Sequence, residues 1–346
     1  MKKKIVNMHE LAKIVGVSSA TVSRALSGQV KGNMKKDTFD RVIEAAKTYG
    51  FVPNQLSAGL RMGYSKTIGI IFPTNINPYY SVLANLIEEK AFKNGYFTYI
   101  CNSNYDVARE LAYIKKLKAQ MVAVIFLCST GLSKLAIEEL NSEKSPIILL
   151  DEEVKNYQGS SIVIDDCFGG NLGADFLIQN NHTDIAIIAG PQKLNSTKER
   201  LRGAFLAFKD KEISIDNNIF YGDYTIDSGR KITEMIFKEN KNITALFCFN
   251  DLMAIGASLM LQKLNKNVPA DVSILGYDNI AYSEIVSPSI STIATPLISL
   301  VDEGVNLVLD KKNNPSLEKN FVITPYLIER ESTSKKAVSP SVPVSG

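Results

Sequence analysis

The sequence has no segment that would anchor it in a membrane or export it. No apolar run approaches the ~20 residues that a transmembrane helix needs. The start, Met1–Asn7, is basic, but no apolar stretch follows it as one would in a signal peptide. These absences argue against a membrane or exported protein, so we expect a cytoplasmic protein that does not contact a membrane.

Side chains typical of metal and catalytic sites are also scarce. There are two histidines and four cysteines, and no Ser-His-Asp set, zinc-ligand spacing or phosphate-binding loop occurs. We therefore expect neither an enzyme nor a protein with a metal or cofactor. The cysteines lie in or beside apolar, strand-like runs, which predicts buried reduced thiols. They are Cys101, Cys128, Cys167 and Cys248.

Charge is distributed unevenly along the chain. At about 150 residues per domain, 346 residues suggest two or three domains. Residues 1–66 carry 12 basic and 4 acidic residues, a net charge of +8, whereas the remainder carries 27 basic and 32 acidic residues, a net charge of −5. This asymmetry indicates a polyanionic partner for the N-terminal part only, although a basic surface is often simply solvated.

A helix, a glycine turn and a second helix are predicted between Leu11 and Gly28. Leu11, Ala12 and Val15 share one face of the first helix, and Ala12 is small enough to let a second helix approach closely. Gly16 then ends the helix, because a tight turn often needs a residue with positive φ.

The second helix follows Ser18, whose hydroxyl can cap it. Val22, Ala25 and Leu26 form its inner stripe, so its polar side chains face outward. Hydroxyls and a guanidinium on an exposed helix can reach base edges and phosphates in the major groove. A plain helical hairpin would share the glycine turn, but the small residues and the local positive charge favour a DNA-binding helix-turn-helix. The outward residues are Ser19, Thr21, Ser23 and Arg24.

A third helix and a shorter fourth one complete this N-terminal part. The third is predicted from Lys35 to Tyr49, ended by Gly50. Gln55–Arg61 is too short to be a stable helix alone, so we expect it to become ordered on DNA. The inward residues predicted for the third helix are Val42, Ile43, Ala45 and Ala46.

The segments Val17–Leu26 and Gly50–Asn54 closely resemble the lactose/galactose repressor (LacI/GalR) family, and the resemblance extends to about Ser332. It implies a homodimer whose heads read a pseudo-palindromic operator, with paired hinge helices in the minor groove. Leu60 matches the leucine that wedges open the central base step. Gly59 replaces a common arginine and costs about 1 kcal/mol of helix propensity relative to alanine. The resemblance implies DNA contacts from Ser18, Ser19, Ala20, Thr21, Ser23, Arg24, Asn54 and Leu60.

Beyond Thr67, short apolar runs alternate with helical patterns, which indicates buried parallel strands in two doubly wound lobes. Ligands of such α/β folds bind at the carboxyl ends of the strands, here between the lobes. The first set of strands is Thr67–Pro73, Phe97–Asn102, Val122–Cys128, Pro146–Asp151 and Ser161–Asp165. The second set is Ile185–Gly190, Ala245–Asn250, Ser273–Asp278, Ile290–Thr295 and Tyr326–Arg330.

Polar and aromatic residues follow these strand ends and suit a polyhydroxy ligand. Carboxylates and amides accept hydrogen bonds from hydroxyls, a guanidinium donates hydrogen bonds to them, and aromatic rings stack on the apolar C–H faces of the ligand. Singly, each has an ordinary alternative: a helix cap, a core ring or a solvated arginine. Their recurrence at corresponding strand ends favours a shared cleft. The candidates are Asn77, Tyr79, Tyr80, Asp151, Arg200, Tyr224, Asn250 and Asp278.

The body resembles the type I periplasmic-binding-protein-like domain attached to these repressors, and most resembles ribose-type members. That resemblance implies effector contacts for all eight candidates. Three positions differ from family patterns: Glu152 stands where ribose-type members often have arginine, Thr295 where they tend to have glutamine, and Leu194 where purine-type members place arginine. Ribose is the leading effector, while another sugar, a sugar phosphate or a nucleobase stays open.

The predicted protein is thus an α/β transcriptional regulator with a small all-α helix-turn-helix head. Its predicted parts are a head, 1–53; a hinge helix and linker, 54–66; a two-lobed effector-binding and dimerisation domain, 67–332; and a disordered tail, 333–346. Gly169, Gly170 and Gly173 are interpreted as sites of close helix packing. A sugar-binding transport protein, an enzyme and a corepressor controlled by a partner protein are the alternatives. The basic head and the missing secretion signal disfavour the first, and the lack of a nucleophile or cofactor motif disfavours the second.

Overall fold

The computed structural model describes residues 6–26, 34–51, 64–129, 131–132, 134–142, 147–215, 217–239, 242–314 and 316–336. It divides into two compact units, Met1–Ser65 and Lys66–Gly346, which we call the head and the body. Asn54, Leu60 and the predicted helix Gln55–Arg61 lie outside the described residues, as does the predicted disordered tail from residue 337 onward.

The head is a three-helix unit around a small apolar core. Its helices are α1 (Met8–Val15), α2 (Ser19–Leu26) and α3 (Lys36–Tyr49). Asn7 caps α1 by accepting a hydrogen bond from the backbone N–H of Glu10, and Gly16 ends it with a φ of +73°. The predicted glycine turn is therefore confirmed. The core contains Val6, Leu11, Ala12, Val15, Val22, Ala25, Val42 and Ala46.

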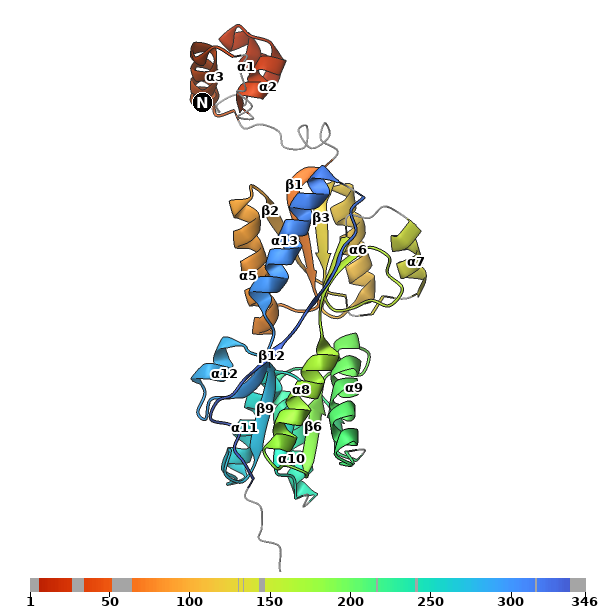
Figure 1. Cartoon of the computed structure of the whole chain (residues 1–346). Coiled ribbons are helices and arrows are strands. Elements are labelled where there is room, and N and C mark those ends of the chain that lie inside the picture. Colours follow the sequence, from red (N-terminus) through yellow and green to blue (C-terminus); the bar gives the residue numbers. More distant parts are fainter. Residues whose placement is uncertain are drawn as a thin grey trace, which may run out of the picture. The chain divides into compact units, whose positions relative to one another are not determined.

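The body has two lobes, each built on a six-stranded sheet with helices on its faces (Figure 1). The sheet of lobe 1 has the order β11-β5-β4-β3-β1-β2. Its strands are β1 (Ser65–Phe72), β2 (Phe97–Asn102), β3 (Val122–Leu127), β4 (Ile147–Asp151), β5 (Ser160–Ile164) and β11 (Asn320–Ile323). Its helices are α5 (Pro78–Lys93), α6 (Val107–Ala119), α7 (Lys134–Ser142) and α13 (Leu297–Asn313).

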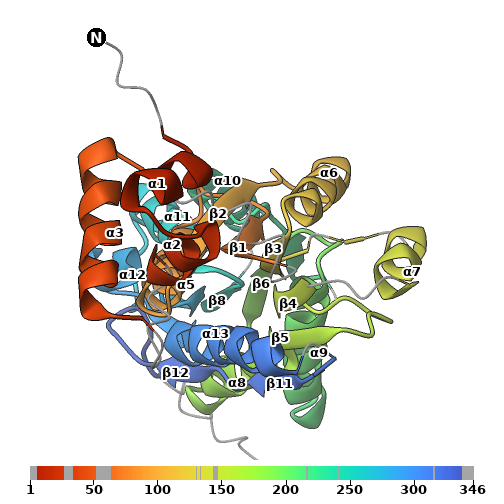
Figure 2. The same ribbon diagram turned by 90° about the horizontal axis from the view of Figure 1, so that it is seen from above.

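Alternating residues of lobe 1 strands face different helices. In β1, Ile70 belongs to the apolar cluster that includes Leu83 of α5, whereas Ile71 belongs to the cluster that includes Ile114 of α6. Viewed from above, α5 and α13 accordingly lie on one side of this sheet, and α6 and α7 lie on the other (Figure 2). Both faces of the sheet are buried, which explains the continuous apolar runs of its central strands.

The sheet of lobe 2 has the order β12-β10-β9-β8-β6-β7. Its strands are β6 (Ile185–Ala189), β7 (Ile219–Tyr221), β8 (Ala245–Cys248), β9 (Ser273–Asp278), β10 (Ser291–Ala294) and β12 (Tyr326–Ile328). Its helices are α8 (Asp166–Gln179), α9 (Asn195–Asp210), α10 (Ile226–Lys238), α11 (Asp251–Lys263) and α12 (Ala281–Ile285). In the part of the chain that the structure describes, no helix is both long and apolar enough to span a bilayer.

The chain crosses between the lobes three times. It passes from β5 to α8, from β10 to α13 and from β11 to β12 (Figure 1). The lobes are therefore discontinuous in sequence, and the carboxyl ends of β5, β10 and β11 lead directly into these crossings. The strand-end residues predicted to bind an effector lie on this side of both sheets.

The structure confirms the predicted α/β two-lobed architecture and corrects three details. The strands β7 and β11 were not predicted, because both are short edge strands, of three and four residues. The strand β12 pairs with β10 antiparallel rather than parallel. Cys167 lies in α8, not beside a strand, and Cys101 and Cys167 are only half-buried, whereas Cys128 and Cys248 are buried.

Glycines let α8 and α9 pack in close contact, as the sequence predicted. A Cβ on Gly203 would lie 1.8 Å from the carbonyl oxygen of Cys167, and one on Gly170 would lie 2.0 Å from that of Arg200. Backbone atoms occupy both positions, so no side-chain rotation can make room. This contact places the middle of α9, around Arg200 and Gly203, beside the start of α8.

We predict that Gly203→Ala destabilises the body by about 1–3 kcal/mol, because α8 and α9 must move apart. Gly304→Ala in α13 is the matched control. Its Cβ would meet side chains and no backbone atom, Phe126 at 3.3 Å and Ile162 at 3.6 Å, and alanine has the higher helix propensity. Urea unfolding of both variants measures the difference, and equal stability of the two variants would contradict the close packing.

Candidate functional site

The second helix of the head presents a polar surface, and its start is capped as predicted. The Ser18 hydroxyl accepts a hydrogen bond from the backbone N–H of Thr21 at 3.1 Å and lies 2.9 Å from the Thr21 hydroxyl. Arg24 is exposed, and its Nε donates to the carbonyl of Ala20 at 3.4 Å. Ala20 is exposed, and Ser19, Thr21 and Ser23 are half-buried.

The inner surface of α2 is fixed against the other two helices. Val22 and Ala25 are buried, while Leu26 packs against the core from a half-buried position. In α3, Val42 and Ala46 are buried as predicted, but Ile43 and Ala45 are only half-buried. The guanidinium of Arg41 donates to the Val15 carbonyl at the end of α1. The outer side of α2 is thus a rigidly held helix surface, which is what major-groove recognition requires.

In lobe 1, three predicted effector residues form a hydrogen-bonded group. The Tyr79 hydroxyl donates to Asp151 Oδ1 at 2.5 Å, and the Tyr80 hydroxyl donates to Oδ2 at 3.5 Å. The two rings meet edge to face, with centroids 5.1 Å apart. Asn77 has a structural role: its side chain accepts a hydrogen bond from the Tyr79 N–H and caps α5. It therefore positions the first turn of α5, which carries the two tyrosines.

In lobe 2, Arg200 is the centre of a buried polar cluster. Its Nε donates to Asp166 Oδ1 at 2.7 Å, and its Nη1 donates to the Phe249 carbonyl at 2.5 Å. Its guanidinium carbon lies 3.6 Å from the centroid of the Tyr277 ring, whose hydroxyl also donates to Asp166. Asp278 is farther away, 3.9 Å from Nη1. Arg200 thus joins several segments of lobe 2, and its ion pair with Asp278 is weaker than its ion pair with Asp166.

Tyr224 and Asn250 form a second pair in lobe 2. The Asn250 side chain donates to the Tyr224 carbonyl at 3.0 Å, and its oxygen accepts from the Met253 N–H to cap α11. The Tyr224 hydroxyl lies 3.0 Å from the Thr197 hydroxyl of α9. Asn250 therefore fixes the backbone of Tyr224, whose ring is half-buried.

The strand-end carboxyls of the two lobes influence each other electrostatically. Burial raises the pKa of Asp151 to about 6, while its hydrogen bond from Tyr79 opposes the rise. Burial also raises the pKa of Asp278 well above its usual range, opposed by the charge of Arg200 and reinforced by Asp151. Burial thus favours the neutral form of both carboxyls, which can donate as well as accept hydrogen bonds.

Sequence reasoning missed several residues at this site. Asp166 directly follows a predicted strand and could have been proposed by the same strand-end rule. Tyr277 lies inside a strand, and Thr197 lies inside a helix, so their positions depend on tertiary packing. Glu152 was noted only as a departure from the ribose type, yet it is buried beside the cleft.

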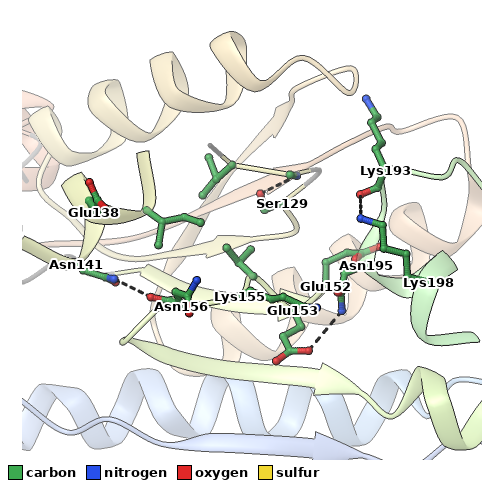
Figure 3. A pocket seen from close by; sticks show the side chains of 14 residues that line it. Ser129, Glu138, Asn141, Glu152, Glu153, Lys155, Asn156, Lys193, Asn195 and Lys198 are labelled. Atoms are coloured by element: carbon green, nitrogen blue, oxygen red, sulfur yellow. Dashed lines mark hydrogen bonds between the residues drawn. The ribbon is translucent and has the colours of Figure 1, made fainter. Parts of the chain in front are cut away.

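A pocket of about 410 Å³ lies beside the cleft, with residues from both lobes in its lining. Glu152 and Glu153 follow β4 of lobe 1, and Lys193, Asn195 and Lys198 come from the start of α9 in lobe 2. Figure 3 shows the Asn195 side chain hydrogen-bonded to Glu153 across this boundary, at 3.4 Å. Because both lobes line the pocket, its size depends on how closely they approach.

Comparison with known proteins identifies both parts of the chain. Residues 7–54 match the model of the bacterial regulatory proteins, lacI family, and residues 174–333 match the periplasmic binding protein-like domain. The regulator DegA of Bacillus subtilis is 30% identical over 334 residues, covering 94% of this chain and 98% of DegA. The repressor PurR of Aliivibrio fischeri strain ES114 is 30% identical over 333 residues, with the same coverage.

The chain belongs to the lacI family. Solved structures agree with this membership. The lac repressor dimer bound to operator and the anti-inducer ONPF has the same fold, with a TM-score of 0.86 at 24% identity, covering 96% of this chain and 100% of that one. A LacI-family regulator from Enterococcus faecium with bound ribose has a TM-score of 0.71 at 27% identity, covering 78% of this chain and 100% of that one.

Membership in the lacI family makes this protein a DNA-binding transcriptional regulator with an effector-binding body. Its head coincides with the matched DNA-binding segment, and its cleft lies in the fold that the periplasmic binding protein-like model describes. The individual DNA and effector contacts stay predictions, and so do the exact domain boundaries.

The protonation of Glu152 generates a testable pH dependence. Burial, reinforced by Asp151 and Asp166 and opposed by hydrogen bonds from Ser196, raises its pKa from 4.5 to about 8. A carboxyl whose pKa is raised in the folded state lowers the free energy of unfolding as the pH rises above its unfolded pKa. The reason is that the unfolded state releases the proton freely, whereas the folded state must either keep it or bury a charge. We predict that Glu152→Gln raises the Tm at pH 8.5 by at least about 2 °C, or roughly 1 kcal/mol.

At pH 4.5 and below, both states hold the proton, so the difference from the unsubstituted protein should shrink as the pH falls from 8.5 to 5. Thermal unfolding followed by circular dichroism at both pH values measures this. The control is Glu153→Gln, which removes the neighbouring exposed charge. A Tm difference for Glu152→Gln that does not vary with pH would contradict the raised pKa.

Proposed function

We propose that the protein is a homodimeric repressor that reads a pseudo-palindromic operator and binds a small polyhydroxy effector, a sugar, between the lobes of its body. The observation that carries the proposal is the position of Asp151 and Asp278 at the carboxyl ends of β4 and β9, which belong to different lobes, with Arg200 beside Asp278 and two tyrosine hydroxyls on Asp151. A ligand that contacts both carboxyls would draw the lobes together. Closure would change the distance between the two heads of a dimer and hence the affinity for DNA.

Three observations favour a sugar over other effectors. The acceptors Asp151 and Asp278 match hydroxyl donors, and the family relative from Enterococcus faecium carries bound ribose. The position that purine-type members use for an arginine is the buried, apolar Leu194. A nucleobase is the second candidate effector, because relatives named PurR align over nearly the whole chain.

A thermal-shift panel separates these candidates. The full chain is heated with D-ribose, D-glucose, ribose 5-phosphate and hypoxanthine, each at several concentrations. A ligand at 100 times its Kd stabilises the folded state by about 2.7 kcal/mol. A shift with a sugar supports the proposal, a shift with hypoxanthine alone supports the nucleobase, and no shift with any of the four would contradict both.

Thr295 provides a sharper test of the cleft. It follows β10, next to Asp278 across the β10–β9 register, and its hydroxyl is buried without a hydrogen-bond partner among the described residues. An unpaired buried hydroxyl is destabilising unless a ligand satisfies it. We predict that Thr295→Val stabilises the free protein by up to about 1 kcal/mol and weakens binding of the active ligand from the panel about tenfold.

The matched control for Thr295→Val is Thr233→Val in α10. Thr233 is the other described residue with a buried, unpartnered hydroxyl, and it lies within a helix away from the strand ends. It should gain stability without a change in ligand affinity. Isothermal titration of both variants decides: equal affinities would show that the Thr295 hydroxyl does not contact the ligand.

The DNA-binding face is tested through its salt dependence. An operator is first selected from random duplex DNA with the full chain, and the Kd is then measured over a range of salt. We predict that Arg24→Ala lowers the slope of log K against log salt by about 1 if its guanidinium contacts a phosphate. Lys47→Ala, which removes a charge at the end of α3, is the control. Equal losses in both variants would indicate only a net-charge effect.

A further inference from the structure

The first turn of α9 has no cap within its own lobe. Leu194 occupies the N-cap position, and its apolar side chain makes no capping hydrogen bond. By contrast, α8, α10 and α11 of the same lobe are capped by Asp165, Thr225 and Asn250. The exposed N–H groups at a helix start need acceptors, and the helix dipole favours acidic ones.

Acidic groups of the other lobe fill this role. The backbone N–H of Ser196 donates to Glu152 Oε2 at 3.1 Å, and the Ser196 hydroxyl donates to Oε1. Next to this pair, the Asn195 side chain donates to Glu153 Oε2 at 3.4 Å. Two consecutive residues after β4 thus bind two consecutive residues of α9. Figure 3 shows the outer part of this contact.

The inner contact is shielded from water, and the outer contact is not. Glu152 and Ser196 are buried, with exposed fractions of 6% and 7%, whereas Glu153 is exposed. The raised pKa of Glu152 means that its carboxyl holds a proton over much of the neutral range. It can then accept from the Ser196 N–H without placing a full negative charge beside Asp151 and Asp166.

We propose that Glu152 and Glu153 form an interlobe latch that caps α9 from lobe 1 and holds the lobes together before an effector binds. Separation of the lobes would leave the Ser196 N–H and hydroxyl without these acceptors, so opening of the cleft is coupled to uncapping of α9. Glu152 stands where ribose-type members often have arginine, which cannot accept a hydrogen bond.

The regulatory meaning of the latch rests on the proposed function. The apparent affinity for an effector is proportional to the fraction of free protein that is already in the closed, binding-competent form. A regulator whose free form is partly closed therefore binds its effector more tightly. Effector binding then causes a smaller shift from the open to the closed form, so its effect on DNA binding is smaller. The latch would accordingly set both how tightly an effector binds and how strongly it switches the head.

Amide hydrogen exchange of the full chain, without DNA or effector, tests the latch. Peptides that cover residues 152–156 and 195–200 report its two sides. We expect Glu152→Ala to increase exchange in both segments, by about tenfold at Ser196, because a buried hydrogen bond between the lobes is lost. Glu152→Gln should retain protection, since its amide oxygen still accepts from the Ser196 N–H and its amide nitrogen can donate to the hydroxyl.

Asp106→Ala is the matched control. Asp106 caps α6 from within lobe 1, accepting from the N–H groups of Ala108 and Arg109 at 2.8 and 3.3 Å. Its loss should increase exchange at the start of α6 and leave residues 152–156 and 195–200 unchanged. This pattern would show that uncapping alone does not loosen the lobes.

Two outcomes would overturn the latch. One is unchanged exchange at residues 195–200 in Glu152→Ala, and the other is equally fast exchange in the Ala and Gln variants. Because the experiment uses neither ligand nor operator, a failed latch leaves the proposed function intact. Conversely, a protein that binds no sugar and no operator can still show the latch.

Discussion

The buried ion pair between Arg200 and Asp166 is the interaction on which the cleft depends. It joins the first turn of α8 to α9, and the same guanidinium binds the carbonyl of Phe249 after β8. Removing one partner of such a pair typically costs about 3–5 kcal/mol, because the other charge stays buried. The glycine contacts between α8 and α9 bring these groups within reach. Packing of two helices therefore precedes, and permits, the polar chemistry at the strand ends.

Backbone conformation at the cleft supports the same view. Asp151, Tyr224 and Asp278 all have positive φ, at +71°, +65° and +100°. Residues other than glycine adopt such conformations at a cost of about 1–3 kcal/mol each, and these conformations concentrate at ligand sites. The surrounding sheets and helix starts hold the three residues in place. The three side chains are thus held in place in the free protein, so binding of the proposed effector would not spend free energy on ordering them.

The parts of the fold that local patterns determine could be predicted from sequence. Gly16, the Ser18 cap and the buried stripe of α2 follow from helix periodicity, and the central strands follow from their apolar runs. The rest depends on contacts between distant segments. Asn77 matched the cleft pattern but caps a helix, and Asp166 became important only through its contact with Arg200. Short edge strands such as β11 have too few residues for a pattern to be recognised.

The three crossings between the lobes have a consequence for synthesis of the protein on the ribosome. Lobe 1 includes α13 and β11, and lobe 2 ends with β12, so neither lobe is complete until the last third of the body has been translated. The head, whose contacts are all local in sequence, is the unit that can fold first. A chain that terminated before Leu297 would lack elements of both sheets at once. A premature stop in this region would leave a folded DNA-binding head attached to two unfinished lobes.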